Sequence, residues 1–147
     1  MSYLDEIKFN KKIVFEKIIP PEKATYKQIK FKNKKLEKYL KEKNIKLYSH
    51  QAQAIEHVKN GKNVVITTPT ASGKSYIYIF SVLEKLAENP YATSIVIFPL
   101  KALARDQYAK IKELIDETEI QATVEIYDGD TPKEKRRQIK QNPPNFL

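Results

Sequence analysis

The 147-residue sequence contains no cysteine and no tryptophan, and it has only three glycines. The absence of cysteine excludes a disulfide framework and a thiolate-bound metal site. No apolar run reaches the roughly 18–20 residues that a membrane span requires. The N-terminal segment MSYLDEIKFNKK mixes acidic and basic side chains and lacks the apolar stretch of a secretory signal. These absences predict a cytoplasmic protein with no membrane partner.

Positive charge is what the sequence has in excess, with 27 basic against 18 acidic residues. Residues 1–46 hold 14 lysines and 6 acidic residues, whereas the remainder is almost balanced, with 13 basic and 12 acidic residues. This segment is predicted to be a basic N-terminal extension. Such a block can bind phosphate backbones by releasing counterions. A solvated, lysine-rich helix face would give the same pattern, so the charge alone does not decide between the two.

From residue 47 onward, short β-branched runs alternate with amphipathic stretches. The predicted strands are 64–67, 94–98 and 124–127, with another beginning at 145–147, and the predicted helices are 33–43, 49–60 (capped by Ser49), 74–88, 101–116 and 132–140. The strands are apolar throughout, which is typical of strands buried on both faces. The alternation predicts an α/β fold with a parallel sheet.

Residues 68–75 read TPTASGKS, between a predicted strand and a predicted helix. This context is that of a phosphate-binding loop, although Thr68 stands where the strict motif has glycine. Gly73 would let the backbone approach the phosphates, Lys74 would bridge the β- and γ-phosphates, and the Ser75 hydroxyl would bind Mg²⁺. The predicted nucleotide-binding residues here are Thr70, Ala71, Ser72, Gly73, Lys74 and Ser75. The alternative is an ordinary turn whose lysine faces solvent.

Four motifs occur in a fixed order: LYSHQ at 47–51, TPTASGKS, FPLKALARDQ at 98–107 and YDGDTP at 127–132. The series resembles superfamily 2 DEAD/DEAH-like helicases. It is most similar to the DNA-repair branch that has a C-terminal zinc-binding domain. The resemblance covers residues 47–147 and implies an incomplete RecA-like P-loop domain that uses ATP and Mg²⁺ to unwind nucleic acid.

The resemblance also implies roles for single residues. Gln51 would read the adenine edge, and Lys101 and Arg105 would contact the phosphates of a single DNA strand. Gln107 would support that segment. A second strand-contacting loop would consist of Gly129, Asp130 and Thr131. A surface helix residue at Gln51, a solvated helix face at 101–107 and a plain turn at 129–131 are the alternatives.

The acidic motif that positions Mg²⁺ and orients the attacking water in such motors has no counterpart here. No apolar strand leads into Asp5-Glu6, and Asp116-Glu117 ends an amphipathic helix. We therefore expect a piece of a longer helicase or a truncated reading frame, which binds nucleotide without hydrolysing it unaided. The missing remainder, including a second RecA-like domain, would belong to the same or another chain.

Two competing hypotheses remain. The first is a non-catalytic nucleic-acid-binding module that uses the basic block 1–46. The second is a stand-alone P-loop kinase, for which no catalytic acid is found.

Overall fold

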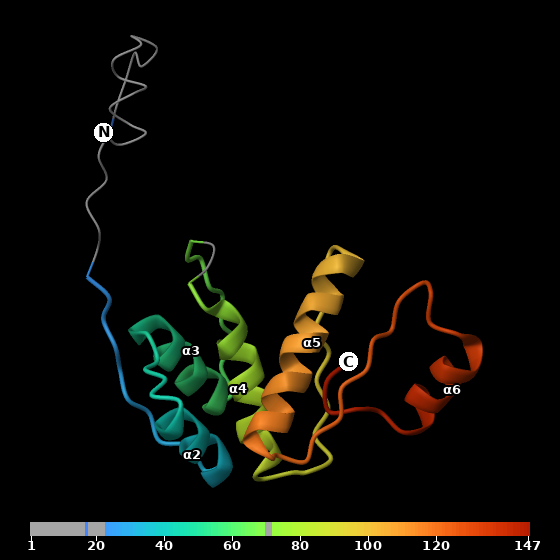
Figure 1. Cartoon of the computed structure of the whole chain (residues 1–147), viewed down its shortest axis with the longest axis horizontal. Helices are drawn as coiled ribbons and strands as arrows, with labels where there is room; N and C mark the ends of the chain where they lie inside the picture. The colour runs from blue at the N-terminus through green and yellow to red at the C-terminus, as the bar shows by residue number, and fades with distance from the viewer. Residues whose placement is uncertain (1–16, 18–22, 70–71) are drawn as a thin grey trace, which may run out of the picture.

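The computed structural model describes residue 17 and residues 23–69 and 72–147. This part of the chain forms the helices α2 (Lys34–Glu42), α3 (Ser49–Lys59), α4 (Lys74–Leu86), α5 (Lys101–Thr118) and α6 (Lys133–Gln141) (Figure 1). All the predicted helices are present, and each boundary lies within two residues of its predicted position. None of the described helices is long and apolar enough to cross a membrane.

Helices α2 to α5 form one packed group, in which α3 lies against α4 and α2 contacts both α4 and α5 (Figure 1). The core buries apolar side chains from every one of these helices and from the segments around them: Phe31, Leu36, Tyr39, Leu47, Ala52, Ile55, Ile79, Phe80, Leu83, Ile111, Leu114 and Phe146. Residues 29–47 thus share the core of the later chain. The domain boundary at residue 46 stays a prediction.

A buried carboxylate fastens the segment before α2 to the helix that follows the phosphate loop. Glu84 on α4 accepts hydrogen bonds from the main-chain amides of Lys32 (2.7 Å) and Asn33 (3.0 Å), and its carboxylate pairs with Lys59 at 2.8 Å. The Asn33 side chain caps α2 and donates to the carbonyl of Leu83 at 2.9 Å. Because buried charges need such partners, this network fixes α2 and α4 relative to each other.

Strand pairing in the described residues is limited to isolated bridges, of which the one between Tyr26 and Tyr48 is antiparallel and the two others are parallel. Phe146 bridges both Ser94 and Val124. The main-chain amide of Leu147 donates to the carbonyl of Ser94 at 3.0 Å, and that of Phe146 donates to the carbonyl of Thr123 at 2.9 Å. Segment 145–147 therefore lies between 94–96 and 123–125 in parallel orientation. The predicted strands 64–67, 94–98 and 124–127 are not formed as strands, so the parallel sheet is not established beyond these bridges.

The expected burial of the extended segments on both faces is wrong. Val64 and Ile66 pack against the helical core, but Val65 is 88% exposed and Ile95 and Ile97 are 75% and 87% exposed. Helices α2 to α5 cover one side only, and α6 lies apart from that group (Figure 1). Within the described residues the pairing of these segments is limited to single bridges and their outer side has no covering helix, which explains both the missing ladder and the exposed side chains.

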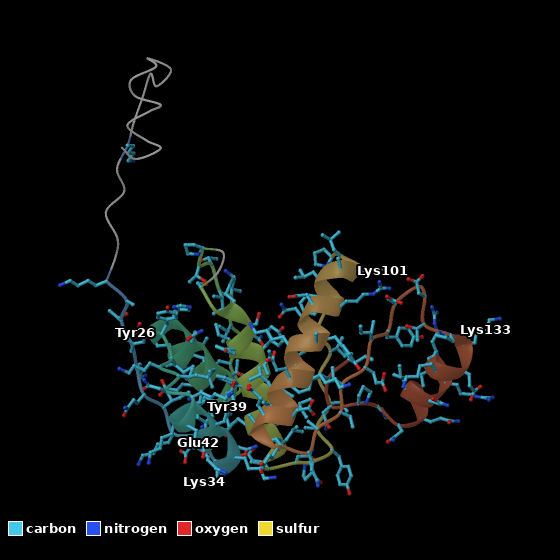
Figure 2. All side chains as sticks on the ribbon, in the orientation of Figure 1. Tyr26, Lys34, Tyr39, Glu42, Lys101 and Lys133 are labelled. Atoms are coloured by element: carbon cyan, nitrogen blue, oxygen red, sulfur yellow. The ribbon has the colours of Figure 1, made fainter. Side chains whose placement is uncertain are left out.

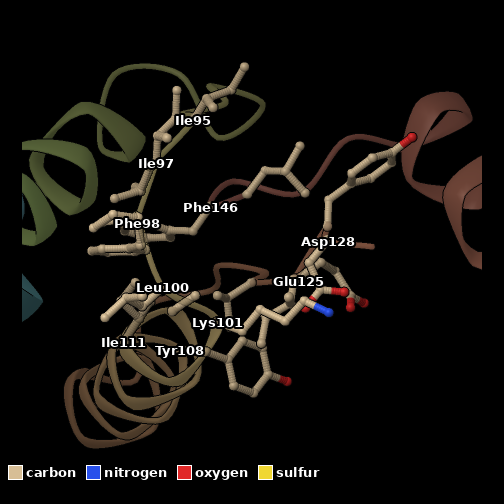
Figure 3. A pocket seen from close by; sticks show the side chains of 17 residues that line it. Ile95, Ile97, Phe98, Leu100, Lys101, Tyr108, Ile111, Glu125, Asp128 and Phe146 are labelled. Carbon is tan, nitrogen blue, oxygen red and sulfur yellow. The ribbon is translucent and has the colours of Figure 1, made fainter. Parts of the chain in front are cut away.

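An apolar cavity of about 340 Å³ lies beside these segments. Its walls come from residues 95–98, from the first half of α5 and from residues 124–128 (Figure 3). Ile97 and Phe98 line one side, and Phe146 lines the floor between the two extended segments.

Candidate functional site

The lysine of the phosphate loop points back into the loop. Lys74 Nζ donates hydrogen bonds to the carbonyls of Thr68 (2.8 Å) and Pro69 (2.5 Å) and to Ser72 Oγ (3.3 Å). Phosphate oxygens could replace these acceptors, because an ammonium group offers three donors. A turn whose lysine faces solvent does not describe this arrangement. Thr70 and Ala71 lie outside the described residues, and Ser75 is half-buried in the first turn of α4.

Gly73 forms the junction between the loop and α4 in a conformation that favours glycine. Its φ is +72°, in the left-handed region, and an added Cβ would overlap Nε2 of Gln51. Gln51 Nε2 donates to the carbonyl of Gly73 at 2.8 Å, while Gln51 Oε1 accepts from the amide of Tyr48 at 2.8 Å. The start of α3 is therefore closed by Gln51 and not by Ser49, since Tyr48 is the N-cap residue.

Gln51 is only 2% exposed, so it is not the surface helix residue that the alternative proposed. Both ends of its side-chain amide are bonded to main-chain groups of the protein. Its reading of an adenine edge stays a prediction.

Three aromatic rings are stacked beside the loop. The ring centroids of Tyr26 and Tyr48 are 5.2 Å apart, and those of Tyr48 and His50 are 5.7 Å apart. His50 Nε2 lies 3.2 Å from the carbonyl oxygen of Ser72. The ring of Tyr48 therefore stacks with two other rings of the protein. The contact of His50 with the phosphate loop was not predicted. The position of His50 beside Gln51 in the LYSHQ motif is the feature that could have indicated it.

The predicted nucleic-acid residues come together at the beginning of α5. Lys101 Nζ lies 2.7 Å from Asp130 Oδ2, and an Arg105 guanidinium nitrogen lies 3.7 Å from the same oxygen. Lys101 is the first residue of α5 (Figure 2). Its side chain extends toward the segment that contains Asp128 (Figure 3). The hydrogen bond from Lys101 holds the pKa of Asp130 below its ordinary value. Two motifs about 30 residues apart thus form one charged cluster.

A hydrogen-bonded turn fixes the shape of the loop at 128–131. The amide of Asp130 donates to Asp128 Oδ1 at 2.8 Å, and the amide of Asp128 donates to Thr131 Oγ1 at 2.9 Å. Arg136 on α6 donates to the carbonyls of Thr131 (2.8 Å), Asp128 (2.8 Å) and Gly129 (3.2 Å). No sequence signal distinguishes Arg136 from the other basic residues of α6.

Gln107 connects the two helices that carry the predicted sites. Tyr78 on α4 donates to Gln107 Oε1 at 2.6 Å, and Gln107 Nε2 donates to Asp106 at 3.0 Å. Burial raises the pKa of Tyr78, so this phenol stays a donor at neutral pH. Helices α4 and α5 begin at the same end of the molecule (Figure 1), and this bond fixes their spacing.

No acidic site for catalysis is assembled in the described part of the chain. Glu117 pairs with Lys43 and accepts from Tyr39 Oη at 3.1 Å, in the last turn of α5, away from Lys101. No cluster of acidic residues and histidines that could hold a metal ion occurs in residues 23–69 and 72–147. Asp5-Glu6 lies outside the described residues.

Lysines of the basic block pair with acidic residues of the later chain. Lys27 lies 2.5 Å from Glu56, Lys32 pairs with Glu88, and Lys43 pairs with Glu117. The hydrogen bond from Lys32 lowers the pKa of Glu88 to about 2. These pairs neutralise part of the charge that the module hypothesis assigns to phosphate binding.

The loop between an extended segment and α4, together with the cluster at α5, defines a protein of the P-loop class. The family model for DEAD/DEAH box helicases matches residues 48–147, and the chain belongs to this family. The matching region contains Gln51, the phosphate loop and the cluster at the start of α5.

Relatives and solved structures agree with this assignment. The chain is 38% identical over 133 residues to the uncharacterized ATP-dependent helicase MJ1574 of Methanocaldococcus jannaschii, a match that covers 88% of this chain and 19% of that protein. It is 42% identical over 126 residues to the ATP-dependent helicase HRQ1 of Saccharomyces cerevisiae, covering 84% and 12%. The structure of the DUF1998 helicase MrfA bound to DNA and AMPPNP superposes with a TM-score of 0.80 at 31% identity, covering 97% and 21%. The chain therefore spans about a fifth or less of the length of these proteins.

Proposed function

We propose that this chain binds ATP with Mg²⁺ at the phosphate loop. The observation that carries the proposal is the position of Lys74, whose ammonium group is held by the carbonyls of Thr68 and Pro69 at the start of α4. A triphosphate entering the loop would take over these donor positions and meet the positive end of the helix. Ser75 would supply one oxygen to Mg²⁺. This fits a metal ion that takes one or two protein ligands and completes its shell with phosphate and water oxygens.

The proposed nucleic-acid contact is a single strand of DNA that crosses the beginning of α5. Lys101, Arg105 and the turn at 129–131 form one surface there, and cations and main-chain amides are the groups that bind phosphates. In the complete protein, this surface and the nucleotide site would couple ATP hydrolysis to strand unwinding. The remainder of the complete protein, which would include the acidic motif and a second RecA-like domain, would supply the catalytic groups that the described residues lack.

The test is nucleotide binding by a Lys74→Ala variant. We expect at least about a tenfold loss of affinity for a fluorescent ATP analogue with Mg²⁺, since a lost charge-assisted bond to phosphate costs about 1.5–3 kcal/mol. Lys85→Ala is the matched control, because Lys85 is an exposed lysine on the same helix whose partner is Glu88. Equal affinity of Lys74→Ala and wild type would reject the nucleotide site.

The module hypothesis makes a different prediction for the same chain. If the basic block were the main contact, replacing three of its exposed lysines, Lys23, Lys30 and Lys46, with alanine would flatten the salt dependence of DNA binding. Lys101→Ala would then leave binding unchanged. The proposed function predicts the opposite pattern.

A further inference from the structure

The cluster at the beginning of α5 has an acidic member that a phosphate-binding surface does not need. Asp130 presents one carboxylate oxygen, Oδ2, to both Lys101 (2.7 Å) and Arg105 (3.7 Å). The two cations stand four residues apart on α5 and so project from the same face of the helix. The oxygen has the position and charge of a phosphate oxygen that would be held by the same two side chains.

The turn that carries this carboxylate is held in place independently of the two cations. The amide of Asp130 is bonded to the Asp128 side chain, and Arg136 holds three carbonyls of the turn, at positions 128, 129 and 131. The side chains of Lys101, Arg105 and Asp130 are all more than half exposed. The main chain that carries the carboxylate is therefore held in place, and the short Asp130 side chain has fewer rotatable bonds than the two cations that meet it.

We propose that Asp130 acts as a built-in competitor that occupies Lys101 and Arg105 until a nucleic-acid phosphate displaces it. This inference rests on the proposed DNA surface. Displacement is feasible because exposed ion pairs contribute little and are screened by salt. A strand that brings several phosphates and contacts the turn at the same time can displace the carboxylate. A single phosphate or a short anion gains too little to do so.

The decisive measurement is the affinity of the 147-residue chain for a fluorescent single-stranded DNA oligonucleotide at several salt concentrations. Asp130→Asn keeps the shape of the side chain and removes its charge. We expect it to bind about two- to fivefold more tightly than wild type, in line with the strength of an exposed pair. The slope of log affinity against log salt should steepen by about 0.7 for each cation that is newly engaged.

Glu134→Gln is the matched control, because it removes one negative charge from the start of α6, where Glu134 pairs with Arg137. It reproduces the change in net charge without freeing Lys101. A gain in affinity for Asp130→Asn no larger than that for Glu134→Gln would overturn the proposal. So would a loss of affinity, which would show that Asp130 supports binding.

A double-mutant cycle separates this inference from the proposed function. In a Lys101→Ala background, the gain from Asp130→Asn should fall to less than half of its value in the wild type, because the carboxylate then has little left to occupy. If Lys101→Ala weakens binding but the gain from Asp130→Asn is the same in both backgrounds, the competitor role is rejected and the DNA surface stands. If Lys101→Ala, Arg105→Ala and Asp130→Asn all bind like wild type, both proposals are rejected.

Discussion

The side-chain amide of Gln51 and the main-chain carbonyl of Gly73 are joined by a 2.8 Å hydrogen bond that connects α3 to the phosphate loop. The contact is so close that any side chain at position 73 would force the Gln51 amide to shift, and the same amide closes the first turn of α3. The start of α3 and the end of the phosphate loop are therefore directly connected, and a change at Gln51 or Gly73 should alter the position of the other residue.

The first prediction concerns Gly73→Ala. The residue has a positive φ, and its new methyl group would overlap Gln51, so two penalties act together. We expect the free energy of unfolding to fall by about 2–4 kcal/mol, of which about 1 kcal/mol comes from the left-handed backbone. Urea denaturation followed by circular dichroism measures the change.

Gly61→Ala is the control for that measurement. Gly61 has a φ of +71°, almost the same as Gly73, but nothing lies within 4 Å of an added Cβ. It should lose only the backbone contribution, about 1 kcal/mol. Equal losses at the two glycines would show that the contact with Gln51 carries no steric restriction.

The second prediction concerns the buried carboxylate of Glu84. The Glu84 carboxylate now accepts from two main-chain amides and one ammonium group. In Glu84→Gln the side chain is neutral, and its NH2 group would face one of the main-chain amides, donor against donor. We expect a loss of about 2–4 kcal/mol in the free energy of unfolding. Glu88→Gln, one turn later and exposed, should change it far less. Similar losses for both variants would show that burial of Glu84 does not matter.

The third prediction concerns pH. The hydrogen bond from Lys43, followed by that from Tyr39, lowers the pKa of Glu117, and the bond from Lys32 lowers that of Glu88 to about 2. A carboxyl whose pKa is lower in the folded state stabilises the fold above its unfolded pKa. This stability is lost as the pH falls through the folded pKa.

The melting temperature should therefore fall between about pH 5 and pH 2, and the fall should be smaller in Glu117→Gln. Thermal scans in a pH series at constant ionic strength test this. An identical pH profile for the variant would show that the Glu117 pairs contribute nothing.

The fourth prediction concerns the bare extended segment at 94–98. Ile95 and Ile97 expose large apolar side chains on an extended segment whose described main-chain hydrogen bonds all go to residues 145–147, and such exposed apolar surface on a short strand pair promotes association. The double variant Ile95→Thr with Ile97→Thr should reduce light scattering on storage by several-fold. Tyr91→Thr is the control, since Tyr91 is 89% exposed but lies outside this segment. Equal improvement by the control would assign the association to general hydrophobicity.

The helices could be predicted from the sequence because their signals are local. Each of these signals involves residues only a few positions apart. Examples are the helix start after Gly73 and the spacing of apolar residues in α4 and in α5. The extended segments were harder, because pairing depends on neighbours far along the chain. Val64–Thr67 has the composition of a buried strand, yet it has no ladder in the described structure. The composition of this segment indicates that it could form a buried strand, but it does not indicate whether other strands lie beside it.

The same contrast between local and long-range signals applies to the candidate site. Lys74, Gly73 and Gln51 were found from motif spacing, and the structure joins Gln51 to Gly73 and Lys74 to Thr68 by hydrogen bonds. The pairing of Asp130 with Lys101 could not be predicted, since nothing in either motif indicates that the turn at 128–131 meets the first residue of α5. Arg136 was missed because a lysine- and arginine-rich helix gives no reason to single out one residue.

The anchoring of Lys32 and Asn33 on Glu84 bears on how this helicase domain should be delimited. The family model begins at residue 48, after the segment that contains Phe31, Leu36 and Tyr39. A protein shortened to that boundary would keep every recognisable motif. It would also expose the ring of Phe80 that packs on Phe31, and it would leave Glu84 with only Lys59 as a partner. The packed core therefore extends beyond the region that marks the family, and it depends on residues that no motif contains.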